Sequence, residues 1–267
     1  MEFHNNPESL RGLRGLVIDM DGVLWQADQP MPGLKEFFEV LRKREIKFIL
    51  ATNNNTTLPE GFVKKAAGMG VQLTIDEIMT ASLATVAYLK ANYPQGSRIY
   101  VIGEAPLKHM ITGAGFEEAD KDVVAVVAAM DRQLTYEMLK RGSILIRGGA
   151  RFIGVNPDAC YPTAEGLAPG SGPIIAALAL ASGVQPIIMG KPEKYIFDTC
   201  LQRMGLKPEE AASLGDRLDT DIEGGLRCGM NAILVLSGVT SAEEAKTSSI
   251  KPTWVFRGIE ELTKALE

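Results

Sequence analysis

The sequence contains few of the residues that bind zinc or build a disulfide framework. Among its 267 residues are three cysteines and two histidines. The cysteines, Cys160, Cys200 and Cys228, are widely spaced and form no Cys-x-x-Cys pair. Zinc sites are built from clustered cysteine and histidine ligands, and an odd number of scattered cysteines does not suit a disulfide framework. We therefore expect neither zinc nor a set of disulfides.

The sequence also lacks basic clusters and long apolar runs. Its 28 lysines and arginines are outnumbered by 33 aspartates and glutamates, which gives a net charge of −5. Without a sustained basic cluster, a surface for nucleic acid or anionic lipid is not indicated. No stretch is apolar for the length that a bilayer span requires, and residues 1–6 lack the basic and apolar segments of a secretory leader. We expect a cytoplasmic protein with no nucleic-acid or membrane partner.

Apolar runs of strand length alternate with amphipathic stretches of helical period, which is the pattern of parallel α/β layers. Strands are expected at residues 13–19, 46–52, 98–103, 123–129, 151–155, 186–189, 212–214 and 232–236, with a last one near Trp254. Helices are expected at residues 34–44, 59–69, 82–92, 105–114, 135–147, 193–204 and 221–228, with a last one near Ile259. The predicted fold class is α/β, with a Rossmann-like parallel-sheet core.

The middle of the chain has its own alternation of strands and helices and ends in the Gly/Pro-rich stretch 166–173. Such a block indicates an inserted domain. We predict a discontinuous catalytic core of residues 1–81 and 186–267, with an inserted α/β domain at residues 82–185. Nucleotide-binding loops are not indicated, because Gly170-Ser171-Gly172 lacks the third glycine of a dinucleotide fingerprint and there is no Walker lysine motif.

Two carboxylates, Asp19 and Asp21, follow directly on the apolar run 16–18, and Gly22 lets the chain turn. In an open α/β sheet, ligands bind in the crevice outside the carboxyl ends of the strands. An acidic pair placed there can hold a cation and attack an electrophile. Asp-Gly is also a common turn dipeptide, so this loop alone fits a turn or a helix cap equally well.

Three further segments at strand ends carry side chains suited to phosphate chemistry. Thr52 and Asn53 offer hydroxyl and amide donors, which can bind phosphoryl oxygens, although a polar helix cap would explain such residues too. A lysine in Gly-Lys-Pro and three aspartates after strand 212–214 complete the set. Helix capping would explain one of those three carboxylates but hardly all of them. The lysine is Lys191, and the three aspartates are Asp216, Asp219 and Asp221.

Repulsion among the carboxylates favours a bound cation. Two like charges about 4 Å apart repel by roughly 4 kcal/mol at an effective dielectric of 20. Gathering Asp19, Asp21, Asp216 and Asp221 would cost a large part of the ~5–15 kcal/mol that keeps a domain folded, and Lys191 alone cannot offset that. An oxygen-only site suits a hard divalent ion, and Mg²⁺ binds through one or two carboxylates plus a substrate phosphate. The sequence therefore predicts a Mg²⁺ cofactor.

Together these motifs resemble those of the haloacid dehalogenase (HAD) superfamily of phosphatases. Asp-x-Asp-Gly-Val, a strand-ending Thr, Gly-Lys-Pro and Gly-Asp-x-x-x-x-Asp occur in the family's order, and the insertion lies between the second and third motifs. The closest likeness is to the NagD-like subgroup, which includes p-nitrophenyl phosphatases and phosphoglycolate phosphatases. The resemblance covers nearly the whole chain.

The resemblance implies a role for each matching residue. Asp19 would be the nucleophile that forms an aspartyl-phosphate, and Asp21 the acid that protonates the leaving oxygen and then activates water. The transferred phosphoryl group would be held by Thr52, Lys191 and the backbone N–H of Asn53. Magnesium would be bound by Asp19, the backbone carbonyl of Asp21, and Asp216, with Asp221 either binding the ion or supporting a ligand. Asp219 matches no fixed family position and is interpreted as a surface or capping residue.

The insertion resembles the subgroup's α/β cap, which closes over the core and contacts the substrate. Candidate contacts flank the Gly/Pro-rich stretch, although each also fits a solvated loop residue. They are Arg151, Asn156, Asp158, Thr163 and Glu165.

These observations predict a Mg²⁺-dependent phosphatase for small phosphomonoesters, of the sugar phosphate, nucleotide, phosphoglycolate or p-nitrophenyl phosphate type. A phosphomutase or phosphotransferase would share Asp19 and Asp21 but pass the phosphoryl group to a second substrate position. A non-enzymatic phospho-acceptor module would gather carboxylates around magnesium without needing Asp21 as an acid or a cap. The expected partner is a small phosphorylated metabolite, and the sequence leaves its identity and the formation of a homo-oligomer open.

Overall fold

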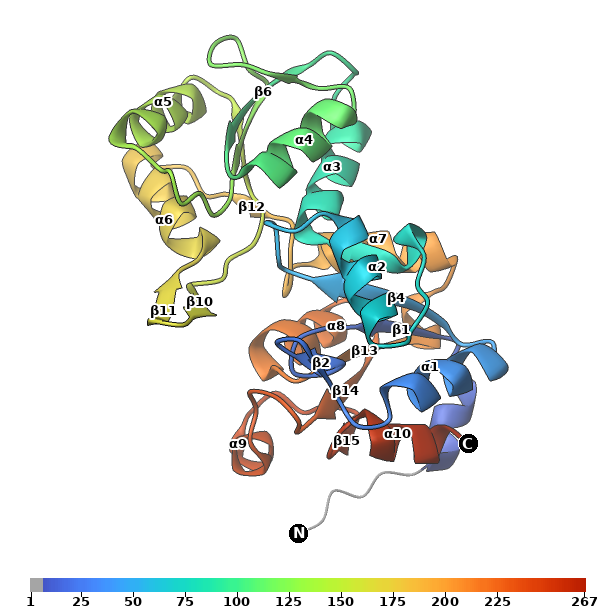
Figure 1. Ribbon diagram of the computed structural model, residues 1–267. Coiled ribbons are helices and arrows are strands. Elements are labelled where there is room, and N and C mark those ends of the chain that lie inside the picture. The colour runs from blue at the N-terminus through green and yellow to red at the C-terminus, as the bar shows by residue number, and fades with distance from the viewer. Residues whose placement is uncertain (1–6) are drawn as a thin grey trace. The chain divides into compact units, whose positions relative to one another are not determined.

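The fold is described from a computed structural model, which defines residues 7–267 (Figure 1). Residues 1–6, in which we expect no secretory leader, lie outside the described residues. The chain divides into two compact units. The first comprises the chain up to Thr52 with Pro59–Met79 and Lys191–Glu267, and the second comprises Asn53–Leu58 with Thr80–Gly190.

A six-stranded sheet in the order β15-β14-β13-β1-β4-β5 forms the centre of the first unit. Its strands are β1 (Gly15–Ile18), β4 (Lys47–Thr52), β5 (Ile78–Thr80), β13 (Ala211–Gly215), β14 (Asn231–Val235) and β15 (Trp254–Phe256). The pairs from β15 through to β4 are parallel. All four residues of β1 are buried, as a parallel strand covered on both faces requires.

Helices cover this sheet from two sides. They are α1 (Leu34–Lys43), α2 (Pro59–Gly68), α7 (Lys194–Met204), α8 (Glu223–Arg227), α9 (Ala242–Thr247) and α10 (Ile259–Leu266). Leu16 and Ile18 of β1 share one apolar core with Phe37 of α1 and Leu262 of α10. Helix α7 packs on β1 and β4. A two-residue-per-strand hairpin, β2 (Trp25–Gln26) and β3 (Gln29–Pro30), follows the acidic loop.

The second unit has its own parallel sheet, in the order β12-β9-β8-β6-β7. Its strands are β6 (Arg98–Ile102), β7 (Glu117–Glu118), β8 (Ala125–Ala128), β9 (Arg151–Gly154) and β12 (Ile187–Ile188). Its helices are α3 (Ala81–Asn92), α4 (Ala105–Gly113), α5 (Tyr136–Arg147) and α6 (Ser171–Ser182). An antiparallel hairpin, β10 (Cys160–Thr163) and β11 (Gly166–Pro169), precedes α6. Val126, Phe152 and Leu178 lie together in this unit's apolar core.

The two units divide at Thr80 and Gly190, where we expected residues 82 and 185. The second shift moves a strand: the one expected at residues 186–189 of the core is β12, which pairs with β9 in the second unit's sheet. A larger difference is the segment Asn53–Leu58, which we placed in the core and which groups with the second unit. Its side chains explain the grouping. The Asn53 amide donates to Asp158 Oδ1 at 3.0 Å, and the Asn55 amide donates to Ser171 Oγ at 2.9 Å.

Four local predictions need correction. Helix α6 occupies residues that we left without structure, and α9 was also missed, although Ser241 and Glu244 form a capping box at its start. The helix expected at residues 221–228 instead begins as a π-helical turn, Leu218–Ile222, and continues as α8. The hairpin strands β10 and β11 were not predicted, and β11 lies within the Gly/Pro-rich stretch 166–173.

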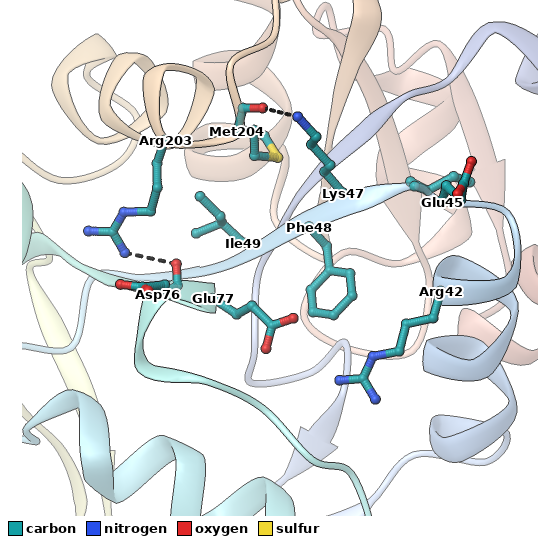
Figure 2. A pocket seen from close by; sticks show the side chains of 10 residues that line it. Arg42, Glu45, Lys47, Phe48, Ile49, Asp76, Glu77, Arg203 and Met204 are labelled. Atoms are coloured by element: carbon teal, nitrogen blue, oxygen red, sulfur yellow. Dashed lines mark hydrogen bonds between the residues drawn. The ribbon is translucent and has the colours of Figure 1, made fainter.

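A groove of 380 Å³ lies at the amino end of β4, the end opposite Thr52 (Figure 2). Its cations bind backbone carbonyl groups. Lys47 donates to the Met204 carbonyl at 2.6 Å, and Arg203 donates to the carbonyls of Asp76 and Ile78 at 3.0 and 2.9 Å. These contacts tie β4, α7 and β5 together, so the groove's cations already have structural partners.

Within residues 7–267, no helix combines the length and the apolar character that crossing a bilayer demands.

Candidate active site

Three adjacent strands bring the predicted catalytic residues to one edge of the first unit's sheet. Asp19 follows β1, Thr52 ends β4, and Asp216 follows β13. Strand β1 lies between the other two, with Ile18 in register with Leu50 and Leu214. The three polar residues therefore leave the sheet at neighbouring points of its carboxyl edge, where ligands of α/β folds bind.

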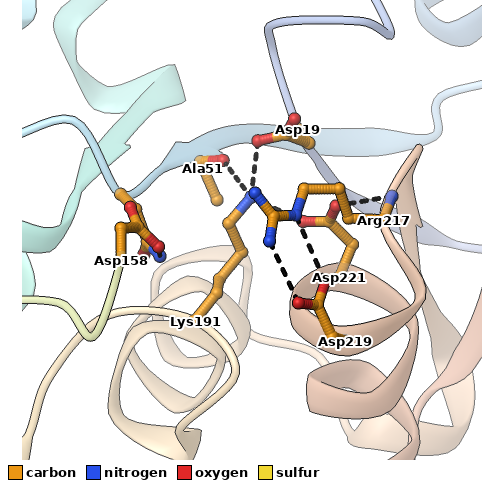
Figure 3. Close-up of polar contacts among 8 residues, drawn as sticks. Asp19, Ala51, Asp158, Lys191, Arg217, Asp219 and Asp221 are labelled. Carbon is orange, nitrogen blue, oxygen red and sulfur yellow. Dashed lines mark hydrogen bonds and ion pairs between the residues drawn. The ribbon is translucent and has the colours of Figure 1, made fainter. Parts of the chain in front are cut away.

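Lys191 is the cation at the centre of this edge, and its side chain is 5% exposed (Figure 3). Its ammonium donates to Asp19 Oδ1 at 2.5 Å, to Asp221 Oδ1 at 2.6 Å and to the Ala51 carbonyl at 3.0 Å. A buried ammonium is stable only when its protons are used in this way. Lys191 therefore fixes the carboxylate that follows β1 and the carboxylate of Asp221 in the π-helical turn after β13.

Asp216 is held in place by a neighbouring loop. Its Oδ2 accepts from the backbone N–H of Val239 at 2.7 Å. Glycines allow that approach, because a Cβ on Gly22 would lie 2.4 Å from this oxygen and one on Gly238 would lie 1.9 Å from it. Gly22 also has a φ of 81°, in the left-handed region that favours glycine. The glycine after the acidic pair thus serves both the turn and the packing against Asp216.

The carboxylates of Asp19, Asp216 and Asp221 could hold a metal ion, since an oxygen from each lies within 4.8 Å of the others. The free Oδ1 of Asp216 supports this fit, because it is buried and has no hydrogen-bond partner among the described residues. An unsatisfied buried carboxylate oxygen is costly unless an ion or water binds it. Oxygen ligands without cysteine or histidine suit a hard cation such as Mg²⁺.

The electrostatics of the three carboxylates agree with this fit. Burial raises the pKa of Asp19 to about 8; Lys191 acts against that rise, while Asp221 and Asp216 add to it. Burial and the nearby Asp221 raise the pKa of Asp216 to about 6. For Lys191, burial lowers the pKa but Asp19 and Asp221 raise it by more, so the ammonium stays charged. The site holds more negative charge than Lys191 neutralises.

The structure places the other predicted residues differently. Asp21 carries its carboxylate outside the cluster, with a side chain that is 64% exposed, so binding of an ion through its backbone carbonyl stays a prediction. Thr52 is buried at the end of β4. Asn53 directly follows Thr52 in the chain but belongs to the second unit, where its carbonyl accepts from Asn156 at 2.8 Å.

Among the predicted cap contacts, the structure brings two together. Asn156 is buried, and its Oδ1 accepts from the backbone N–H of Asp158 at 3.1 Å. Both line a cavity of 160 Å³ in the second unit, together with Arg132 and Tyr161, which sequence reasoning missed. The remaining three candidates do not line this cavity; Arg151 is exposed at the start of β9, and Thr163 and Glu165 are exposed at the β10–β11 turn.

Asp219 pairs with Arg217, at 3.2 and 3.0 Å from the guanidinium. The side chain of Asp219 is 65% exposed and that of Arg217 is 44% exposed, which agrees with the interpretation of Asp219 as a surface residue. The backbone N–H of Arg217 makes a separate contact with the carboxylate cluster: it donates to Asp221 Oδ2 at 3.2 Å.

Comparison with known proteins places the chain in a family. Residues 16–117 match the haloacid dehalogenase-like hydrolase family, and residues 188–262 match a HAD-hydrolase-like family. An acid sugar phosphatase of Staphylococcus saprophyticus is 34% identical over 97% of this chain and 100% of its own length. The chain belongs to the haloacid dehalogenase-like hydrolases.

Solved structures show the same family relationship. A 4-nitrophenylphosphatase from Thermotoga maritima has a TM-score of 0.91 and 33% identity, covering 97% of this chain and 99% of its own. NagD from Escherichia coli K-12 has a TM-score of 0.87 and 30% identity, covering 93% and 98%. The predicted fold class is confirmed, as is the prediction of a HAD-type phosphoric monoester hydrolase of the NagD-like and p-nitrophenyl phosphatase subgroup.

A substitution next to Asp216 tests the packing of the site. Gly238→Ala would put a methyl group 1.9 Å from Asp216 Oδ2 and 2.5 Å from its Cγ, so the carboxylate must move. We expect kcat/KM to fall by about 10²-fold, because displacing a catalytic group by about 1 Å can cost that much. Steady-state kinetics beside Gly12→Ala, where a Cβ meets nothing within 4 Å, measures the effect. Equal activity of the two variants would show that the loop can retreat without moving Asp216.

Proposed function

We propose that this chain hydrolyses small phosphomonoesters through a phosphorylated Asp19. The observation that carries the proposal is the buried lysine held between Asp19 and Asp221 beside a third carboxylate, Asp216. A carboxylate fixed at a strand end can act as a nucleophile, and a buried ammonium beside it can stabilise the negative charge of a phosphoryl group. The acid sugar phosphatase and the 4-nitrophenylphosphatase among the relatives support small phosphate esters as substrates.

In the first step, an Asp19 oxygen attacks phosphorus and the bond to the leaving oxygen breaks. Asp21 donates its proton to that oxygen, and its exposed side chain leaves room for the departing alcohol. In the second step, Asp21 accepts a proton from water and the water oxygen attacks phosphorus. The bond between phosphorus and the Asp19 oxygen breaks, which releases inorganic phosphate and restores the Asp19 carboxylate. Lys191 keeps Asp19 oriented, and Thr52 and the Asn53 backbone N–H bind phosphoryl oxygens.

We further propose Mg²⁺ as the cofactor, held by Asp19 and Asp216 with the Asp21 carbonyl, while Asp221 binds it or supports the other ligands. When bound, it supplies positive charge to the phosphoryl oxygens. The unpartnered Asp216 Oδ1 and the raised pKa values of Asp19 and Asp216 support a cation at this position.

Phosphate release from a panel of sugar phosphates, nucleotides, phosphoglycolate and p-nitrophenyl phosphate tests the function. A hydrolase releases phosphate from the panel without any acceptor. A phosphotransferase would need a second substrate, and a phospho-acceptor module would release at most one phosphate per chain. Trapping of a base-labile phosphoryl group on Asp19 after rapid acid quench would support the covalent route.

The role of Asp21 predicts a dependence on the leaving group. Asp21→Asn cannot protonate the leaving oxygen, so kcat for an alkyl phosphate should fall by roughly 10²–10⁴-fold. The first step with p-nitrophenyl phosphate should fall much less, because nitrophenolate leaves without protonation. Pre-steady-state release of nitrophenolate, compared with turnover of an alkyl phosphate, measures the contrast. An equal loss in the first step for both substrates would leave Asp21 with a structural role only.

The second unit is proposed to select substrates as a cap. Its cavity is lined by Asn156, Asp158, Arg132 and Tyr161. We expect substitutions in this cavity to change kcat/KM more for some substrates than for others. Cytoplasmic location and the absence of nucleic-acid and membrane partners stay predictions from the sequence.

A further inference from the structure

Lys65, on helix α2, lies beside the proposed general acid. Its ammonium is 4.0 Å from Asp21 Oδ1 and 4.0 Å from Asp28 Oδ1. The same ammonium sits over the indole of Trp25, 5.0 Å from the ring centroid. All four residues belong to the first unit. None of the sequence motifs includes this lysine.

Trp25 gives Lys65 a fixed platform. Its side chain is among the largest that are fully buried, at 1% exposure, so the ring cannot swing away. The ring is tied to the acidic loop, because the Trp25 carbonyl accepts from the backbone N–H of Gly22 at 2.8 Å and Asp21 forms a bridge with Trp25. A cation over an indole face is held by the ring's quadrupole. The same turn therefore positions both the Lys65 ammonium and the Asp21 carboxylate.

Asp21 has little else to orient it. Its side chain is 64% exposed, and Lys65 makes the only ion pair or hydrogen bond of the Asp21 carboxylate among the side chains of residues 10–267. A general acid must lie within hydrogen-bond reach of the oxygen that it protonates. A carboxylate that rotates freely in solvent occupies that geometry for only part of the time.

We propose that Lys65 is a positioning residue for Asp21, which it holds ready to protonate the leaving group. The inference rests on the proposed acid role of Asp21. Lys65 does not touch the phosphoryl group; it acts by restraining the Asp21 carboxylate from one side while the indole fixes the ammonium from the other. Asp28 shares the ammonium, but its side chain is 95% exposed, so this second contact is the weaker one in water.

The test is Lys65→Met, which keeps the apolar stem over Trp25 and removes the charge. We expect kcat for an alkyl phosphate to fall by roughly two- to fivefold, the range for one partly exposed charge contact, with KM unchanged. The nitrophenolate burst from p-nitrophenyl phosphate should keep its rate, because that leaving group needs no proton. Lys65→Arg, which restores a cation over the ring, should recover most of the alkyl phosphate activity.

Two further variants separate this role from a structural one. Lys64→Met removes the neighbouring exposed charge of the same helix and should have no effect on either substrate. In an Asp21→Asn background, Lys65→Met should cause no further loss, because the two changes remove the same function. An equal loss for both substrates, or a full loss on top of Asp21→Asn, would overturn the proposal. If Asp21→Asn itself proved harmless, the acid assignment would fail instead, and the two failures are distinguishable.

Discussion

Asp19→Asn is expected to abolish phosphate release while the fold survives. The amide keeps the shape of the carboxylate but removes the attacking charge, so kcat should fall by at least about 10³-fold for every substrate. The free energy of unfolding should not fall, as it would if one partner of an ordinary ion pair were removed. Because burial holds the pKa of Asp19 at about 8, its ionisation is unfavourable in the metal-free protein, and Lys191 keeps Asp221 and the Ala51 carbonyl as partners.

Thermal unfolding and phosphate release, measured on the same preparations, check this expectation. Without metal and near neutral pH, Tm of the variant should equal or exceed that of the unchanged protein. Asp219→Asn is the matched control, because it makes the same chemical change at an exposed aspartate outside the carboxylate cluster. Activity of Asp19→Asn close to that of the control would remove Asp19 from the reaction, and a large drop in Tm would make its loss of activity uninformative.

The sheet edge could be predicted from the sequence because it depends on local patterns. A parallel α/β alternation puts all strand ends on one side, so Asp19, Thr52 and Asp216 must share an edge whatever the loops do. The register of β1 with β4 and β13 then brings them together. Lys191 could be named as a candidate from its place between a strand and a helix, but its burial between two carboxylates could not be predicted, since one such lysine is usually a surface residue.

What the sequence could not show depends on contacts between distant segments. Segment 53–58 groups with the second unit because Asn53 and Asn55 bond to residues more than 100 positions away. Helix α6 could not be predicted because its sequence is apolar with almost no polar face and so lacks the periodicity of an amphipathic helix. Lys65 is one of 28 basic residues, and only the fold places it over a buried tryptophan beside Asp21.

Removal of divalent metal is the second change expected to abolish activity. Without a cation, Asp19, Asp216 and Asp221 repel one another and only Lys191 opposes them, so Asp19, the proposed nucleophile, stays largely protonated near neutral pH. A chelator should reduce phosphate release to background, and Mg²⁺ should restore it. Metal should also stabilise the fold, by about 2.7 kcal/mol when its free concentration is 100 times the dissociation constant.

That stabilisation should grow with pH, which gives a readout independent of activity. The folded-state pKa values of Asp216 and Asp19, about 6 and about 8, lie above the ordinary value of 3.8. The metal-free fold therefore binds these protons more tightly than the unfolded chain does, and it loses stability as pH rises from about 4 through about 8. Magnesium must displace the same protons, so the gain in Tm on adding Mg²⁺ should be small near pH 5 and largest near pH 8.5. Asp216→Asn should remove the gain at every pH, whereas Asp219→Asn should keep it. A Mg²⁺ effect on Tm that ignored pH, or that survived Asp216→Asn, would place the ion somewhere other than this cluster.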